Sequence, residues 1–254
     1  MNTQNESKNE QVRAALATES GAGADLRVGG ARERTKRLTT VAMLCTAAYI
    51  LVLLSHMIPI KVAGFLNYDP SDIVTVIGGF LFGPLTALLI SVTVSFIEFI
   101  TISSTGPIGL IMNVISTVSF ACVAAFIYKR KQTLAGAVIA LAAGAVAMTA
   151  VMLLWNYIIT PLYMNVPRAQ VMTMLLPIFL PFNLLKGALN GTVTLLLYKP
   201  LVTALRRAQL IAATRGDGAV QQGRSPGKPL LLLLPAVAVL ITCALVLLAW
   251  AGVI

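Results

Sequence analysis

The sequence is short of charge, of histidine and of the residue groupings that support catalysis or metal binding. Only 11% of its 254 residues are charged, and it has one histidine and three cysteines. Cys45, Cys122 and Cys243 share no metal-ligand or redox spacing, so we interpret them as small packing residues. The sequence has no phosphate-binding loop of the G-x-x-x-x-G-K-[ST] type, and His56 alone does not make a convincing Ser/His/Asp set. We therefore expect neither an enzyme nor an ATPase, and we expect no metal and no cofactor.

What the sequence has instead is apolar length. Hydrophobic residues make up 57% of the chain, and its mean hydropathy is +0.86. Apolar runs recur along most of it, and about 20 such residues suffice to cross a hydrocarbon core of roughly 30 Å. These runs exclude a soluble domain of this size and predict an all-α integral membrane protein.

The net charge is +10, and most of the basic residues lie beside the apolar runs. Seven Lys and Arg lie in residues 1–37, three form Lys129–Lys131, and six lie between Lys199 and Lys228. Basic residues cluster on the cytoplasmic side of membrane proteins. We therefore interpret the charge as a topology signal rather than a nucleic-acid surface, and predict a multi-pass protein of a prokaryotic plasma membrane with a cytoplasmic N-terminus.

The apolar runs divide the chain into four parts. We expect a disordered basic cytoplasmic tail at 1–37, a six-helix core at 38–207, a cytoplasmic linker at 208–228 and a seventh transmembrane helix at 229–254. Within the core the predicted helices begin near residues 39, 73, 84, 108, 133 and 172, and an external loop is expected at 161–171.

The apolar stretch 73–100 allows two interpretations, a single tilted helix or two helices that turn at Gly83-Pro84. Proline opens a helix well and breaks one badly. Two crossings place all three basic clusters on one side of the membrane, whereas one crossing does not. We therefore predict two helices, the first of them short.

Lys186 is the most informative residue in the spans. A lysine at the centre of a membrane helix costs about 2.5–3.5 kcal/mol, so it faces a cavity or a partner. Asn183 lies three residues earlier on the same helical face, and Pro177 and Pro181 predict a kink beside it. Such a face suits hydrogen bonding to a polar ligand. The alternative is an Asn–Lys pair that neighbouring helices satisfy for structural reasons.

Other polar residues near the spans have a structural and a functional interpretation. Asn156 lies between two aromatic residues that are typical interfacial anchors. In "NYDPSD", Asp72 suits a helix cap, and Tyr68 and Asp69 suit a lid over a pocket. For Glu98 we consider an ion pair with Lys186.

In combination, "FLNYDPSDIVTVIGGFLFGP", "STGPIG", "NYIITPLY" and "PFNLLKG" resemble the riboflavin-specific S components of energy-coupling factor (ECF) transporters. The resemblance covers about residues 37–207. It implies a six-helix subunit that takes riboflavin from outside the cell, together with a transmembrane coupling protein and two cytoplasmic ATPases.

The same resemblance assigns roles to individual residues. It implies that Asn183, Lys186 and Asn156 contact the flavin and that Tyr68 and Asp69 belong to a closing loop. It also matches the family's alanine motif for docking on the coupling protein to Ala42 and Thr46, the second of which departs from alanine.

Three rival functions remain open from the sequence. The chain suits an S component for another vitamin or flavin analogue, a secondary transporter that needs no ATPase, or a structural membrane subunit that binds no ligand.

Overall fold

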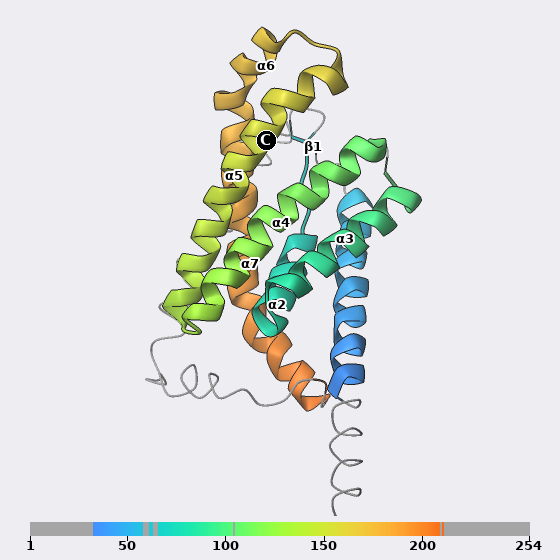
Figure 1. Ribbon diagram of the computed structural model, residues 1–254, viewed down its shortest axis with the longest axis vertical. Coiled ribbons are helices and arrows are strands. Elements are labelled where there is room, and N and C mark those ends of the chain that lie inside the picture. Colours follow the sequence, from blue (N-terminus) through green and yellow to red (C-terminus); the bar gives the residue numbers. More distant parts are fainter. Residues whose placement is uncertain (1–32, 58–60, 63–65, 104, 209, 211–254) are drawn as a thin grey trace, which may run out of the picture. The chain divides into compact units, whose positions relative to one another are not determined.

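The structure is a computed structural model that describes residues 33–57, 61–62, 66–103, 105–208 and 210 (Figure 1). The chain divides into two units, Met1–Thr40 and Val41–Ile254. Within the first unit, residues 33–40 form the beginning of helix Glu33–Met57.

The described part of the second unit is helical apart from a pair of two-residue antiparallel strands, β1 (Lys61–Val62) and β2 (Leu66–Asn67). After the end of helix Glu33–Met57, its helical elements are α2 (Ser71–Phe82), α3 (Pro84–Thr101), α4 (Gly106–Arg130), α5 (Leu134–Met164), α6 (Arg168–Met174), the π-helical η1 (Leu175–Phe179) and α7 (Leu180–Arg207).

The described part of the chain contains six apolar helical segments. Five are long and apolar enough to span a membrane, and α2 is a shorter sixth. The predicted six-helix core is therefore confirmed. The first helix begins at Glu33, inside the segment predicted as a tail. The predicted seventh helix and nearly all of the predicted linker lie outside the described residues, as do residues 1–32.

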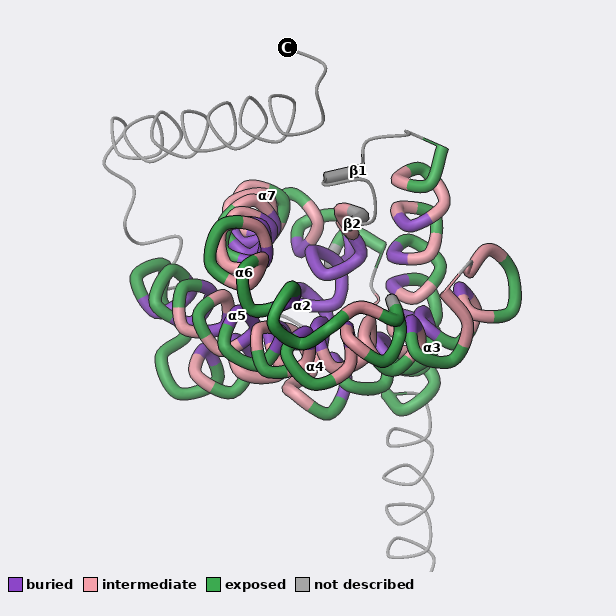
Figure 2. Tube along the Cα trace, turned by 90° about the horizontal axis from the view of Figure 1, so that it is seen from above, coloured by how far each residue is buried: buried purple, intermediate pink, exposed green. Residues whose placement is uncertain are grey.

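The predicted break at Gly83-Pro84 is confirmed. Gly83 has φ 95° and ψ 172°, a conformation that disfavours any residue with a Cβ, and Pro84 is the first residue of α3. The short helix α2 is buried along most of its length among α3, α4 and α7 (Figure 2). A helix too short to span fully needs this shelter, because lipid does not satisfy its terminal backbone groups.

Small residues allow α4 and α5 to pack closely. Ala121, Ala124 and Ala140 are fully buried. A Cβ added to Gly144 would lie 2.7 Å from the carbonyl oxygen of Phe120, so only glycine fits there without a shift. Lipid provides no hydrophobic drive between helices, and close approach of this kind supplies much of their packing energy.

The connection from α5 to α7 is tighter than predicted. Only residues 165–167 separate α5 from α6, with Asn165 left-handed at φ 51°, whereas the sequence predicted a loop at 161–171. Pro177 lies in the π-helical η1, in which the N–H of Leu180 bonds to the carbonyl of Leu175. This irregular turn is the structural counterpart of the predicted kink, since proline removes an α-helical hydrogen bond.

Candidate functional site

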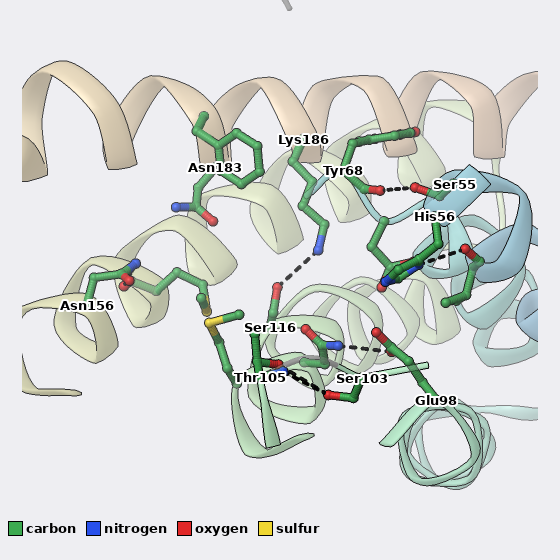
Figure 3. A pocket seen from close by; sticks show the side chains of 16 residues that line it. Ser55, His56, Tyr68, Glu98, Ser103, Thr105, Ser116, Asn156, Asn183 and Lys186 are labelled. Carbon is green, nitrogen blue, oxygen red and sulfur yellow. Dashed lines mark hydrogen bonds between the residues drawn. The ribbon is translucent and has the colours of Figure 1, made fainter. Parts of the chain in front are cut away.

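A polar pocket lies at one end of the helical unit, lined by helix Glu33–Met57 and by α3, α4, α5 and α7 (Figure 3). The segment that precedes α2 and the turn between α3 and α4 complete its lining. Because successive helices alternate in direction, the basic turn at Lys129–Lys131 lies at the opposite end of α4 and α5. The pocket volume is about 100 Å³.

Lys186 lines this pocket and forms a buried ion pair. Its Nζ lies 3.1 Å from Oδ2 of Asp72 on α2, and it donates to Oγ of Ser116 on α4 at 3.3 Å. The lysine side chain is 8% exposed and the aspartate side chain is fully buried. Asp72 also accepts from Thr117 Oγ1 at 2.6 Å. The charge of the lysine is thus compensated by a carboxylate on a neighbouring helix.

The predicted capping role of Asp72 is wrong, and the ion pair considered for Glu98 is not found. Asp72 does not cap α2, because its carboxylate bonds to side chains of α4 and α7; Asp69 Oδ1 instead accepts the N–H of Ser71 at 2.8 Å. Glu98 is not the ion-pair partner of Lys186. Its Oε2 accepts from Nδ2 of Asn113 at 3.0 Å.

Asn190 joins the ion pair to the segment before α2. It is fully buried, and its Nδ2 donates to the backbone oxygen of Asp69 at 3.0 Å and to Asp72 Oδ2 at 3.1 Å. Its Oδ1 accepts from the Tyr68 hydroxyl at 2.5 Å. One side chain of α7 therefore fixes both the partner of Lys186 and the Tyr68–Asp69 segment.

The structure brings Asn183 and Asn156 to the same pocket as Lys186 (Figure 3). Asn183 Nδ2 donates to the Phe179 carbonyl at 2.7 Å, and Asn156 Nδ2 donates to the Met152 carbonyl at 2.8 Å. Each bond anchors the amide to its own helix. An amide group has two N–H donors and two acceptor lone pairs, so both asparagines retain hydrogen-bonding capacity for a ligand.

Tyr68 and Asp69 also line the pocket. The backbone oxygen of Tyr68 accepts from Ser55 Oγ of the first helix, while its hydroxyl bonds to Asn190 of α7. These two bonds hold the segment between two helices.

Ala42 and Thr46 lie away from the pocket. Both are exposed on the first helix, on the side opposite the buried Leu44 and Ala48, and Thr46 Oγ1 donates to the Ala42 carbonyl at 3.0 Å.

Sequence reasoning missed the contributions of Asp72, Asn190 and Ser116. A signal for Asn190 was present, because it lies four residues after Lys186 and so shares its helical face. For Asp72 the signal was its need for a cation partner within an apolar segment. Ser116 offered none, since serine is common in membrane helices.

Comparison with known proteins agrees with this architecture. The family model described as "ECF transporter, substrate-specific component" matches residues 36–198. "Riboflavin transporter RibU" of Staphylococcus aureus is 30% identical over 181 residues, which cover 69% of this chain and 95% of the relative. "Riboflavin transporter FmnP" of Bacillus subtilis is 29% identical over 189 residues, which cover 70% and 99%.

A solved structure has the same fold. It is described as "Structure and mechanism of the S component of a bacterial ECF transporter", and it matches with a TM-score of 0.58 and 28% identity over 68% of this chain and 98% of its own. The buried ion pair and the polar pocket therefore lie within the part of the chain that these proteins share. The chain belongs to the family of substrate-specific components of ECF transporters.

Proposed function

We propose that this chain is the riboflavin-binding membrane subunit of an ECF-type, ATP-dependent importer. The observation that carries the proposal is the convergence of one lysine and two asparagines, from α5 and α7, on a single pocket within a membrane protein of this family. The names of the two relatives, both riboflavin transporters, support riboflavin as the ligand.

The chemistry of riboflavin suits this pocket. Its pyrimidine edge presents carbonyl oxygens and one N–H, and the rest of its ring system is flat and apolar. Lys186 donates to ring carbonyls, while Asn183 and Asn156 both donate and accept. Met152 and Phe182 offer apolar surface beside them. Pockets that bind small molecules combine apolar lining with a few convergent polar groups in this way.

Binding requires some movement of the pocket lining. Pockets that enclose drug-sized ligands measure about 300–1,000 Å³, and this one is smaller. Lys186 reaches across it to Ser116. A flavin would replace that contact and displace the lining around it, with Tyr68 and Asp69 closing over the ligand.

The placement of charge supports entry from outside the cell. Lys129, Arg130 and Lys199 lie near the end of the helices opposite the pocket. If this basic end faces the cytoplasm, as in most membrane proteins, the N-terminus is cytoplasmic and the pocket opens outward. A transmembrane coupling protein, docked at Ala42 and Thr46, and two ATPases would then supply the energy for release inside.

The direct test is spectroscopic. The protein is purified in detergent from cells grown with riboflavin, and its absorption is recorded in the near-ultraviolet and blue, where flavins absorb. We expect a yellow protein with one riboflavin per chain, because tight ligands persist through purification. Colourless protein that also fails to quench the fluorescence of added riboflavin would overturn the assignment.

A second experiment separates an ECF subunit from a secondary transporter. Riboflavin uptake is measured in a host that lacks the coupling protein and the ATPases, and again after these are supplied. We expect uptake only in the second case. Equal uptake in both would identify a transporter that works alone.

A further inference from the structure

We propose that the turn between α4 and α5 binds the headgroup of an anionic phospholipid, with Arg130 as the residue that holds its phosphate. This inference goes beyond the proposed function, because it requires neither riboflavin nor the ATPases. The site consists of Phe126 and Lys129–Lys131, which we call the headgroup site. It lies at the end of α4 that is remote from the pocket (Figure 1).

The positive charges of the headgroup site have no counter-charge in the described part of the chain. Lys129–Lys131 are consecutive and exposed, and none of the three forms an ion pair with a described carboxylate. The described carboxylates of this unit are at the other end of α4: Asp69 and Glu98 line the pocket, and Asp72 pairs with Lys186. Like charges on neighbouring positions repel one another. An anion from outside the chain would relieve that repulsion.

The Arg130 side chain is held in a position to receive such an anion. Its Cζ lies 4.8 Å from the centroid of the Phe126 ring, one helical turn earlier on α4. A cation–π contact of this kind uses the face of the guanidinium group and leaves the N–H groups along its edge available. Two parallel N–H groups match two oxygens of a phosphate. Because the ring already orders the arginine, binding costs less side-chain entropy.

The position of Phe126 identifies the anion as a lipid. The ring is 52% exposed on a helix that is long and apolar enough to span a membrane, so it faces acyl chains. Leu134 and Val138, at the start of α5, add further exposed apolar surface. A phospholipid presents acyl chains and then a phosphate, in the same order as Phe126 and Arg130 along α4. The acidic surface of a protein would match the charges and leave the ring without a partner.

The flanking lysines favour an anionic lipid over a zwitterionic one. Both classes have a phosphate that Arg130 can hold. In phosphatidylcholine, however, the cationic choline group lies beside the phosphate and would approach Lys129 and Lys131, which disfavours binding. Phosphatidylglycerol has only hydroxyl groups there. We therefore expect the site to prefer phosphatidylglycerol.

The test compares these two lipids, with identical acyl chains, on the purified full-length protein in detergent. Native mass spectrometry counts the lipid bound at each concentration. One variant, Lys129→Gln/Arg130→Gln/Lys131→Gln, removes the charges. Because those charges also direct insertion, Arg130→Lys and Phe126→Leu are measured as well, since both keep the charge. The matched control is Arg168→Gln, at an exposed position at the start of α6. Size-exclusion profiles and thermal unfolding check that each protein is folded.

We expect the wild-type protein to bind phosphatidylglycerol about tenfold more tightly than phosphatidylcholine, since each basic residue contributes a few-fold near an anionic lipid. The triple variant should lose this preference, and Arg168→Gln should keep it. Arg130→Lys and Phe126→Leu should each reduce the preference about threefold, by loss of the stacked guanidinium group.

Equal affinity of the wild-type protein for the two lipids would overturn the proposal and leave the exposed charges to an acidic protein surface. A folded triple variant with the wild-type preference would place lipid binding elsewhere on the chain and would also overturn it. If Arg130→Lys and Phe126→Leu both bind as the wild type does, the role given to the stacked guanidinium group is wrong.

Discussion

From Phe120 to Tyr128, α4 packs against α2 and α5 through alanines and aromatic rings, whereas from Met112 to Ser116 the same helix lines a polar pocket. At this packed, C-terminal end of α4, the rings of Phe80 and Tyr128 stack with their centroids 4.1 Å apart. At the N-terminal, pocket end of α4, Asn113 hydrogen-bonds to Glu98 of α3 and Ser116 to Lys186 of α7.

The difference shows how one bundle separates stability from binding. Small residues at the packed end let helices approach closely, which is the main source of helix association in lipid. Polar groups at the pocket end are costly in a membrane and are retained where they serve a ligand. The Lys186–Asp72 pair lies between these ends, so we expect it to affect both stability and ligand binding.

The largest expected effect comes from breaking that pair. Lys186→Met leaves the buried Asp72 carboxylate without its cation, and removing one partner of a buried ion pair costs about 3–5 kcal/mol. Thermal unfolding in detergent measures the loss. Adding Asp72→Asn should recover most of it, because the charge that lost its partner is gone. Lys199→Met, at the exposed end of the same helix, serves as the control. Unchanged stability in Lys186→Met would show that the pair contributes nothing to folding.

The next effect probes the packed end alone. Gly144→Ala places a Cβ 2.7 Å from the Phe120 carbonyl oxygen, and overpacking of this kind costs about 1–3 kcal/mol. In Gly191→Ala, the matched control, the nearest atom lies at an ordinary 3.5 Å. We expect Gly144→Ala to lower the unfolding temperature and to leave riboflavin affinity intact. A loss of affinity in the folded variant would mean that the two ends are coupled.

A smaller effect is expected from Asn190→Ala, which releases Tyr68 and Asp69 from α7. Leaving buried hydrogen-bonding groups unpaired costs about 1–3 kcal/mol. Because the released segment lines the ligand pocket, we expect riboflavin affinity to fall about tenfold. Thr192→Ala is the control on the same helix, because its hydroxyl bonds only to the Ala188 carbonyl among the hydrogen bonds described. Equal affinities for the two variants in fluorescence titrations would remove Asn190 from the binding account.

The smallest effect on riboflavin affinity is expected from a deletion outside the described residues. Deleting residues 216–254 should leave riboflavin affinity unchanged, because the described residues that line the pocket all lie between Val52 and Lys186. Loss of binding by a truncated protein that remains monodisperse would show that the binding core extends further along the chain.

The sequence predicted the apolar helices and the break in the chain better than the interior of the pocket. Apolar length and Gly83-Pro84 are local signals, so six helices and their turn followed directly. Lys186 and Asn183 stood out because polar groups are rare in membrane spans. The sequence did not identify the partner of Lys186, since Asp72 and Glu98 are both acidic and only the fold decides which one lies at 3.1 Å.

The central claim is that Lys186 serves the ligand as well as the fold. The double variant Lys186→Met/Asp72→Asn tests it most directly, because it removes the ion pair without leaving a buried charge. Riboflavin is titrated into the purified double variant and the wild-type protein, with fluorescence quenching as the readout. We predict a folded double variant whose affinity is lower by about 10- to 100-fold, the contribution of a hydrogen bond from a charged donor. A folded double variant that binds riboflavin as tightly as the wild type would contradict the account and reduce Lys186 to a structural residue.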